Sequence, residues 1–155
     1  MTERSDPDEV QVLSRAADYS SLAAHLSALG LHQAATMSWT SGPVPNYAEW
    51  RGPGVIARFE TDFDSGLKTL SIVGEVPEGW DDGLDLMTLA EAELLIGSED
   101  KSEALAGLGA ARILAAPELE EAVTMRLLDP DFDIGGEAAM AISDIHSRSR
   151  QRDAH

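Results

Sequence analysis

The chain has 155 residues, no cysteine and a formal net charge of −17 at pH 7. This length predicts about one domain, residues 1–155, that buries a hydrophobic core without disulfide bonds, and the lack of cysteine excludes thiol catalysis and thiolate metal sites. The charge far exceeds the magnitude of about 2–8 typical of a small domain, which argues against direct nucleic-acid binding and favours a basic partner.

Two short helices are expected at the start of the chain. The sequence from Asp6 to Glu9 places an oxygen acceptor, a proline and a carboxylate where a helix begins, so a first helix is predicted to run to about Asp18. A second helix follows Ser20 or Ser21 and ends at Gly30. We find no apolar segment of signal-peptide type or of membrane-spanning length, so we expect a cytoplasmic protein without membrane contact.

Alternating apolar and polar residues then predict a small antiparallel sheet of about three strands. The first strand covers about residues 32–40. The second and third cover 55–60 and 69–73 and form a hairpin whose loop closes at Gly66. Three strands need a cover for their apolar face, and the helices supply one.

A segment with three prolines, residues 42–54, is predicted to be an irregular loop. It carries Tyr47 and Trp50, which we interpret as candidate anchors for a partner, because aromatic side chains within a polar rim often dominate binding energy. The alternative is that both side chains fold back onto the sheet.

Turn-forming residues at 76–83 mark a boundary, and the chain beyond it is predicted to be helical. Four helices are expected, beginning near Leu84, Ser102, Pro117 and Glu137. The domain thus divides into three subregions: 1–76 with the first helices and the sheet, 84–147 with the later helices, and a flexible tail at 148–155.

The last third of the chain contains a near-duplication, Leu94–Leu114 and Leu127–His146. In each copy a leucine pair leads through an acidic turn into an alanine-rich helix, and the copies align with a slip of one residue. Over about 84–147 this pattern resembles the short HEAT-like repeats common in bacterial proteins. The resemblance implies paired antiparallel helices and a protein-binding surface without chemistry of its own. Helix packing that selects small residues is the alternative explanation.

Five carboxylates of the two acidic turns are candidates for steering a basic partner: Glu99, Asp100, Asp129, Asp131 and Asp133. The last three imitate the start of a calcium loop. Such a loop needs glycine at its sixth position and glutamate at its twelfth, where this chain has Ile134 and Met140. We therefore predict no metal site, no cofactor and no catalytic residue.

These observations predict an α+β fold in which N-terminal helices and a sheet of about three strands pack with a four-helix HEAT-like repeat pair. The expected function is that of a non-catalytic acidic binding protein, an inhibitor or immunity-type protein that covers a basic surface such as that of a nuclease toxin. Alternatives are a phage-type DNA mimic or anti-defence protein, and an accessory or scaffold subunit. A small enzyme with carboxylate chemistry has the least support. If the acidity does not serve binding, it is a solubility feature. The sequence does not indicate an oligomeric state.

Overall fold

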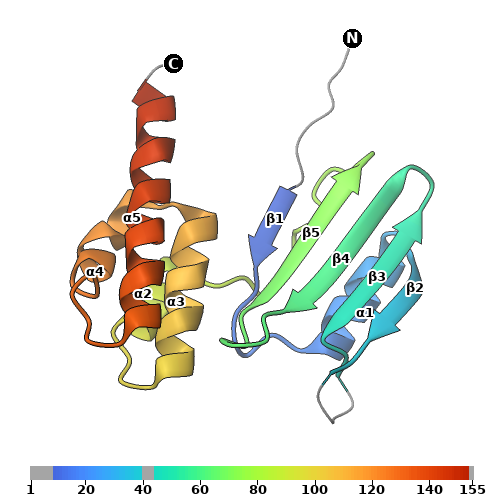
Figure 1. Ribbon diagram of the computed structural model, residues 1–155. Coiled ribbons are helices and arrows are strands. Elements are labelled where there is room, and N and C mark those ends of the chain that lie inside the picture. Colours follow the sequence, from blue (N-terminus) through green and yellow to red (C-terminus); the bar gives the residue numbers. More distant parts are fainter. Residues whose placement is uncertain (1–8, 40–43, 154–155) are drawn as a thin grey trace. The chain divides into compact units, whose positions relative to one another are not determined.

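The computed structural model describes residues 9–39 and 44–153, which form two compact units (Figure 1). The sheet unit contains the described residues up to Asp62 together with Lys68–Leu86. The helical unit contains Phe63–Leu67 and the described residues from Met87 onward. None of the helices in these described ranges has the length and apolar character that crossing a membrane requires.

The sheet unit is built on five antiparallel strands in the order β1-β5-β4-β3-β2. Their bounds are Glu9–Val12 for β1, His32–Met37 for β2, Tyr47–Gly52 for β3, Val55–Thr61 for β4 and Lys68–Gly74 for β5. All six residues of β2 are exposed, and β3 is its one neighbour in the sheet. The ladder to β3 therefore holds this edge strand in place.

One helix, α1 (Tyr19–Ala28), buries Leu22 and Leu26 against the sheet. Asp18 begins this helix because its carboxylate accepts a hydrogen bond from the Ser21 backbone N–H at 3.0 Å. Alternate residues of the strands share the same core, in which the largest side chains are Trp50, Phe59, Leu70, Ile72 and Trp80. The opposite face of the sheet carries the intervening, more polar residues.

The helical unit contains α2 (Leu89–Ile96), α3 (Lys101–Leu114), the 3₁₀ turn η1 (Pro117–Leu119), α4 (Glu120–Thr124) and α5 (Phe132–Asp153). Helix α3 packs against both α2 and α5 through small buried residues. At Gly107 the backbones of α3 and α2 approach so closely that a Cβ atom would lie 2.5 Å from the Ile96 backbone nitrogen. The glycine permits this close contact.

The prediction of about three strands and two N-terminal helices is wrong in two places. Residues 9–12 of the expected first helix form β1, because Val10 and Val12 pair with β5, while Asp6–Asp8 lie outside the described residues. The expected loop 42–54 contains β3, whose alternating residues place Ala48 and Trp50 in the core.

The four-helix repeat pair also needs correction. Five-residue α4 and 22-residue α5 do not form a matched second hairpin. The prediction of a flexible tail at 148–155 is wrong for residues 148–153, which are the last residues of α5. Residues 154–155 lie outside the described part. Within α5, the side chains of Ile134, Ala138, Ala141 and Ile145 recur at helical spacing and are all buried.

Candidate protein-binding surface

The turn between α4 and α5 carries three large apolar side chains that are almost fully exposed. Met125 is 79%, Leu128 95% and Phe132 90% exposed. We call the segment Met125–Phe132 the apolar turn. Large exposed apolar side chains that lie close together in the sequence and have polar neighbours are candidates for contact with another protein. These residues were not predicted to be exposed contact residues, although Leu128 and Phe132 are apolar positions in an otherwise acidic turn.

Arg126 fixes the apolar turn to the neighbouring turn between α2 and α3. Its Nη1 donates hydrogen bonds to the carbonyl oxygens of Ile96 at 2.9 Å and Ser98 at 3.1 Å. Its Nη2 pairs with the Asp129 carboxylate at 2.9 Å. The side chain is 17% exposed, so these contacts lie in a poorly hydrated environment where hydrogen bonds to a charged group are strong.

Lys101, the first residue of α3, ties the same two turns together a second time. Its Nζ lies 3.1 Å from Asp131 and 2.9 Å from Asp133. Asp131 also accepts a hydrogen bond from the Asp133 backbone N–H at 2.9 Å at the start of α5. The hydrogen bond from Lys101 holds the pKa of Asp131 below its usual range.

The five predicted steering carboxylates therefore meet in two adjacent turns, but most of them have structural partners. Asp129, Asp131 and Asp133 pair with Arg126 or Lys101, and Asp100 caps α3 through the Glu103 backbone N–H at 3.0 Å. Of the five, Glu99 is exposed and forms no ion pair with any described residue. The pairing reduces the charge that this group presents to a partner.

The two predicted aromatic anchors point to opposite faces of β3 rather than lying on a loop. Trp50 is 2% exposed, and its ring centroid lies 6.0 Å from that of Tyr19 in the core. A partner therefore cannot reach Trp50 in the folded sheet unit, and its side chain packs into the core, as the alternative interpretation expects. Tyr47 is half-buried on the other face.

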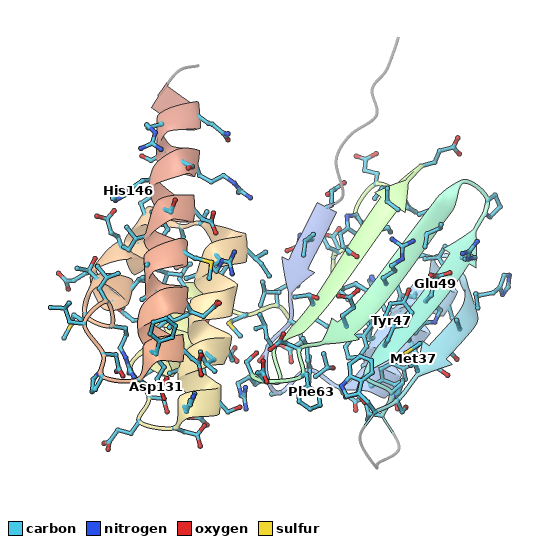
Figure 2. The ribbon with its side chains drawn as sticks, in the orientation of Figure 1. Met37, Tyr47, Glu49, Phe63, Asp131 and His146 are labelled. Carbon is cyan, nitrogen blue, oxygen red and sulfur yellow. The ribbon has the colours of Figure 1, made fainter. Side chains whose placement is uncertain are left out.

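On that other face, Tyr47 belongs to a polar cluster around Glu49 (Figure 2). The Tyr47 hydroxyl donates to Glu49 at 2.9 Å, the Arg51 Nε donates at 2.6 Å and the Arg58 Nε at 3.4 Å. The hydrogen bond from Arg51, followed by that from Tyr47, lowers the pKa of Glu49 below its ordinary value. This cluster was not predicted, but the alternation of Tyr47, Glu49 and Arg51 indicates it.

The lowered pKa predicts how Glu49 affects stability as pH changes. Because the folded-state pKa is depressed, the stabilisation is complete above the unfolded-state value of about 4.3 and is lost as pH falls through the folded value. Glu49→Gln should therefore be less stable than the wild type at neutral pH, and the two should converge in acid. Chemical denaturation across that pH range measures the gap, with Glu60→Gln on β4 as the matched control. A gap that is constant with pH would contradict the assignment.

Five cations of the described residues form ion pairs within the fold. Arg51 and Arg58 bind Glu49, Lys101 and Arg126 bind the acidic turns, and Arg112 pairs with Glu137 and Asp144. By contrast, a set of exposed carboxylates forms no ion pair with any described residue: Glu60, Glu75, Glu78, Asp82, Asp85, Glu93, Glu118 and Glu121. Both units therefore present uncompensated negative charge.

Within residues 9–39 and 44–153, no group of three histidine or acidic side chains is arranged to hold a metal ion. The chain matches no family model, no curated protein and no solved structure.

Proposed function

We propose that the protein is a non-catalytic acidic binding module that covers a basic surface of a partner protein, as an inhibitor or immunity-type protein covers a nuclease toxin. The observation that carries this proposal is the apolar turn, with three large apolar side chains 79–95% exposed beside carboxylate-rich turns. A folded domain exposes such a group where it contacts another protein.

Rigidity of the apolar turn supports its use as a contact site. Arg126 fixes the apolar turn to the turn between α2 and α3, and Lys101 fixes it to the start of α3. A preorganised surface loses less conformational entropy on binding, so more of its contact energy appears as affinity.

The exposed carboxylates complement the apolar contacts. A net charge of −17 attracts a basic partner over long distances and raises the association rate, an effect that salt screens. Protein interfaces commonly combine apolar contacts with charged ones, and the apolar turn and the unpaired carboxylates provide both kinds. The partner is thus expected to present an apolar depression surrounded by lysine and arginine.

The experiment compares proteins captured from a lysate by the wild type and by the double variant Leu128→Ser and Phe132→Ser. Phe63→Ser is the matched control, because Phe63 is 76% exposed in the same unit but lies outside the apolar turn. The captured partner should bind the double variant at least about tenfold more weakly, since each anchor side chain contributes more than about 1 kcal/mol. Equal binding by the wild type and both variants would overturn the proposal.

A second candidate is an accessory or scaffold subunit whose contacts are apolar, which the near-complete exposure of Leu128 and Phe132 also favours. The two functions differ in their response to salt. Association with an inhibited basic partner should slow steeply as salt rises, whereas an apolar scaffold contact should be nearly indifferent. Stopped-flow measurement of the association rate at several salt concentrations separates them.

A further inference from the structure

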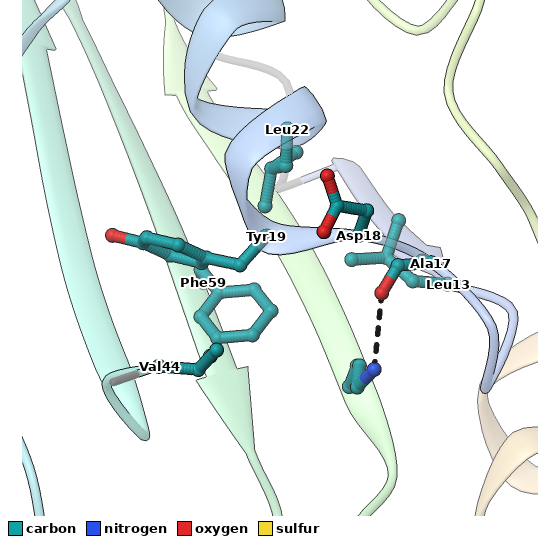
Figure 3. Close-up of a pocket in the computed structure, with 8 residues that line it drawn as sticks. Leu13, Ala17, Asp18, Tyr19, Leu22, Val44 and Phe59 are labelled. Atoms are coloured by element: carbon teal, nitrogen blue, oxygen red, sulfur yellow. Dashed lines mark hydrogen bonds between the residues drawn. The ribbon is translucent and has the colours of Figure 1, made fainter. Parts of the chain in front are cut away.

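Two adjoining hollows lie in the sheet unit beside the start of α1, and Figure 3 shows the residues that line the larger one. Their volumes are about 120 and 70 Å³, and they share the walls Leu13, Ala17, Asp18 and Leu22. We call them together the α1 groove. Because four residues line both hollows, the two lie close enough for one extended ligand to reach both.

The larger hollow is suited to an apolar side chain. Phe59 and Val44 complete its wall, and the Tyr19 ring packs on Phe59 with centroids 5.4 Å apart. Its volume of about 120 Å³ is well above the roughly 10–15 Å³ that one water molecule needs, so the hollow has room for the four carbon atoms of a leucine or isoleucine side chain.

The charge beside the groove favours a cation at its other end. Asp18 borders both hollows, and Asp85 borders the smaller one. The lysine at the larger hollow, Lys68, directs its ammonium at the wall, where it donates to the carbonyl oxygens of Arg15 at 3.2 Å and Ala17 at 3.1 Å (Figure 3). Asp18 and Asp85 thus both border the smaller hollow, and Asp18 borders the larger one as well.

The acidic segment that contains Asp85 is fixed in place. His25 of α1 donates a hydrogen bond from Nε2 to the Trp80 carbonyl oxygen, and the Trp80 side chain is buried in the core. Gln11 of β1 donates to the Asp81 carboxylate at 2.8 Å. These contacts hold the segment against α1 and β1, so the negative charge beside the smaller hollow keeps its position in the folded protein.

We propose that the α1 groove binds a short extended segment of the partner in which a leucine-sized apolar side chain is followed by lysine or arginine. The apolar side chain fills the larger hollow, and the cation pairs with Asp18 and Asp85. This inference rests on the proposed function for the identity of the ligand as part of a basic protein. The groove and its chemistry are independent of the apolar turn.

Blocked peptides test the proposal directly on the full-length protein. The probe is acetyl-Leu-Lys-Lys-amide, titrated while NMR shifts of the Leu13 and Leu22 methyl groups are followed. Acetyl-Ala-Lys-Lys-amide should bind about tenfold more weakly or worse, because it lacks three buried apolar carbons. Acetyl-Leu-Glu-Glu-amide should not bind. Equal affinity for all three peptides, or shifts that are not centred on the groove, would overturn the proposal.

Two variants separate the apolar and charged contributions. Ala17→Leu fills the shared wall and should abolish binding, with retention of the amide spectrum elsewhere as the check on folding. Asp18→Asn keeps a helix-capping side chain but removes the charge, so affinity should fall about two- to fivefold. Asp82→Asn is the charge-matched control, since Asp82 does not line the groove. Unchanged affinity in both groove variants refutes the inference.

Failure of the groove and failure of the proposed function give different results. If the proposed function fails, serine substitution of Leu128 and Phe132 leaves capture unchanged, while peptide binding at the α1 groove is unaffected. If the groove inference fails, the peptide titration is negative, whatever the apolar turn does.

Discussion

Replacing Arg126 with methionine is expected to lower the free energy of unfolding of the helical unit by about 3 kcal/mol. The substitution keeps much of the apolar stem but removes the guanidinium that binds the Ile96 and Ser98 carbonyl oxygens. It also leaves the Asp129 carboxylate, 19% exposed, without its cation. Poorly hydrated polar groups that lose their partners account for most of the loss.

Arg112→Met provides the matched control for this experiment. Arg112 also pairs with two carboxylates, Glu137 at 3.5 Å and Asp144 at 3.3 Å, but its side chain is 38% exposed. Water and salt screen such pairs, so the control should change stability by less than about 1 kcal/mol. Chemical denaturation followed by circular dichroism measures both variants. Equal losses would contradict the role assigned to Arg126.

Gly107→Ala is expected to destabilise the helical unit by about 1–3 kcal/mol, although alanine is the better helix former. The new Cβ atom would lie 2.5 Å from the Ile96 nitrogen and 2.9 Å from the Leu95 carbonyl carbon. Both are backbone atoms, so α2 and α3 must move apart. That movement loosens the packing of α3 throughout its contact with α2.

The control lies two residues along the same helix. At Gly109 the nearest atom to an added Cβ is the Leu67 Cδ2 at 3.1 Å, the end of a side chain that can rotate. Gly109→Ala should therefore be neutral, or stabilising by up to about 1 kcal/mol through helix propensity. Thermal unfolding of the two variants should give shifts of opposite sign, or a clear drop for Gly107→Ala alone. A similar shift in both would show that the α2–α3 contact can relax.

Local signals in the sequence were sufficient where they agreed with the tertiary contacts. The second predicted helix, from Ser20 or Ser21 to Gly30, corresponds to α1, because Leu22 and Leu26 face the core and Gly30 has the positive φ of 90° that ends it. The hairpin of β4 and β5 was predicted from period-two alternation. In both cases short-range pattern and long-range packing select the same structure.

The sequence misled where a strong local signal competed with distant pairing. Asp6 and Pro7 are good helix-starting residues, yet Val10 and Val12 gain a ladder with β5, and propensity of a few tenths of a kcal/mol cannot outweigh it. The prolines at 43 and 45 are typical of a loop, so β3 was not predicted, although Ala48 and Trp50 have the spacing of a strand. Of the candidate site, the two acidic turns were predicted, whereas their ion pairs depend on which helices become neighbours.

The open edge at β2 gives the negative charge a protective role in the behaviour of the protein at high concentration. Of the devices that usually prevent a sheet edge from adding strands of another molecule, the strand His32–Met37 has a register shift between Gln33 and Ala35, but it has no acidic residue, lysine, arginine or proline. Repulsion between copies carrying a charge of −17 can substitute for these devices at low ionic strength. As salt shortens the screening length to about 8 Å, that long-range protection weakens and edge-to-edge aggregation becomes the main hazard for the folded chain.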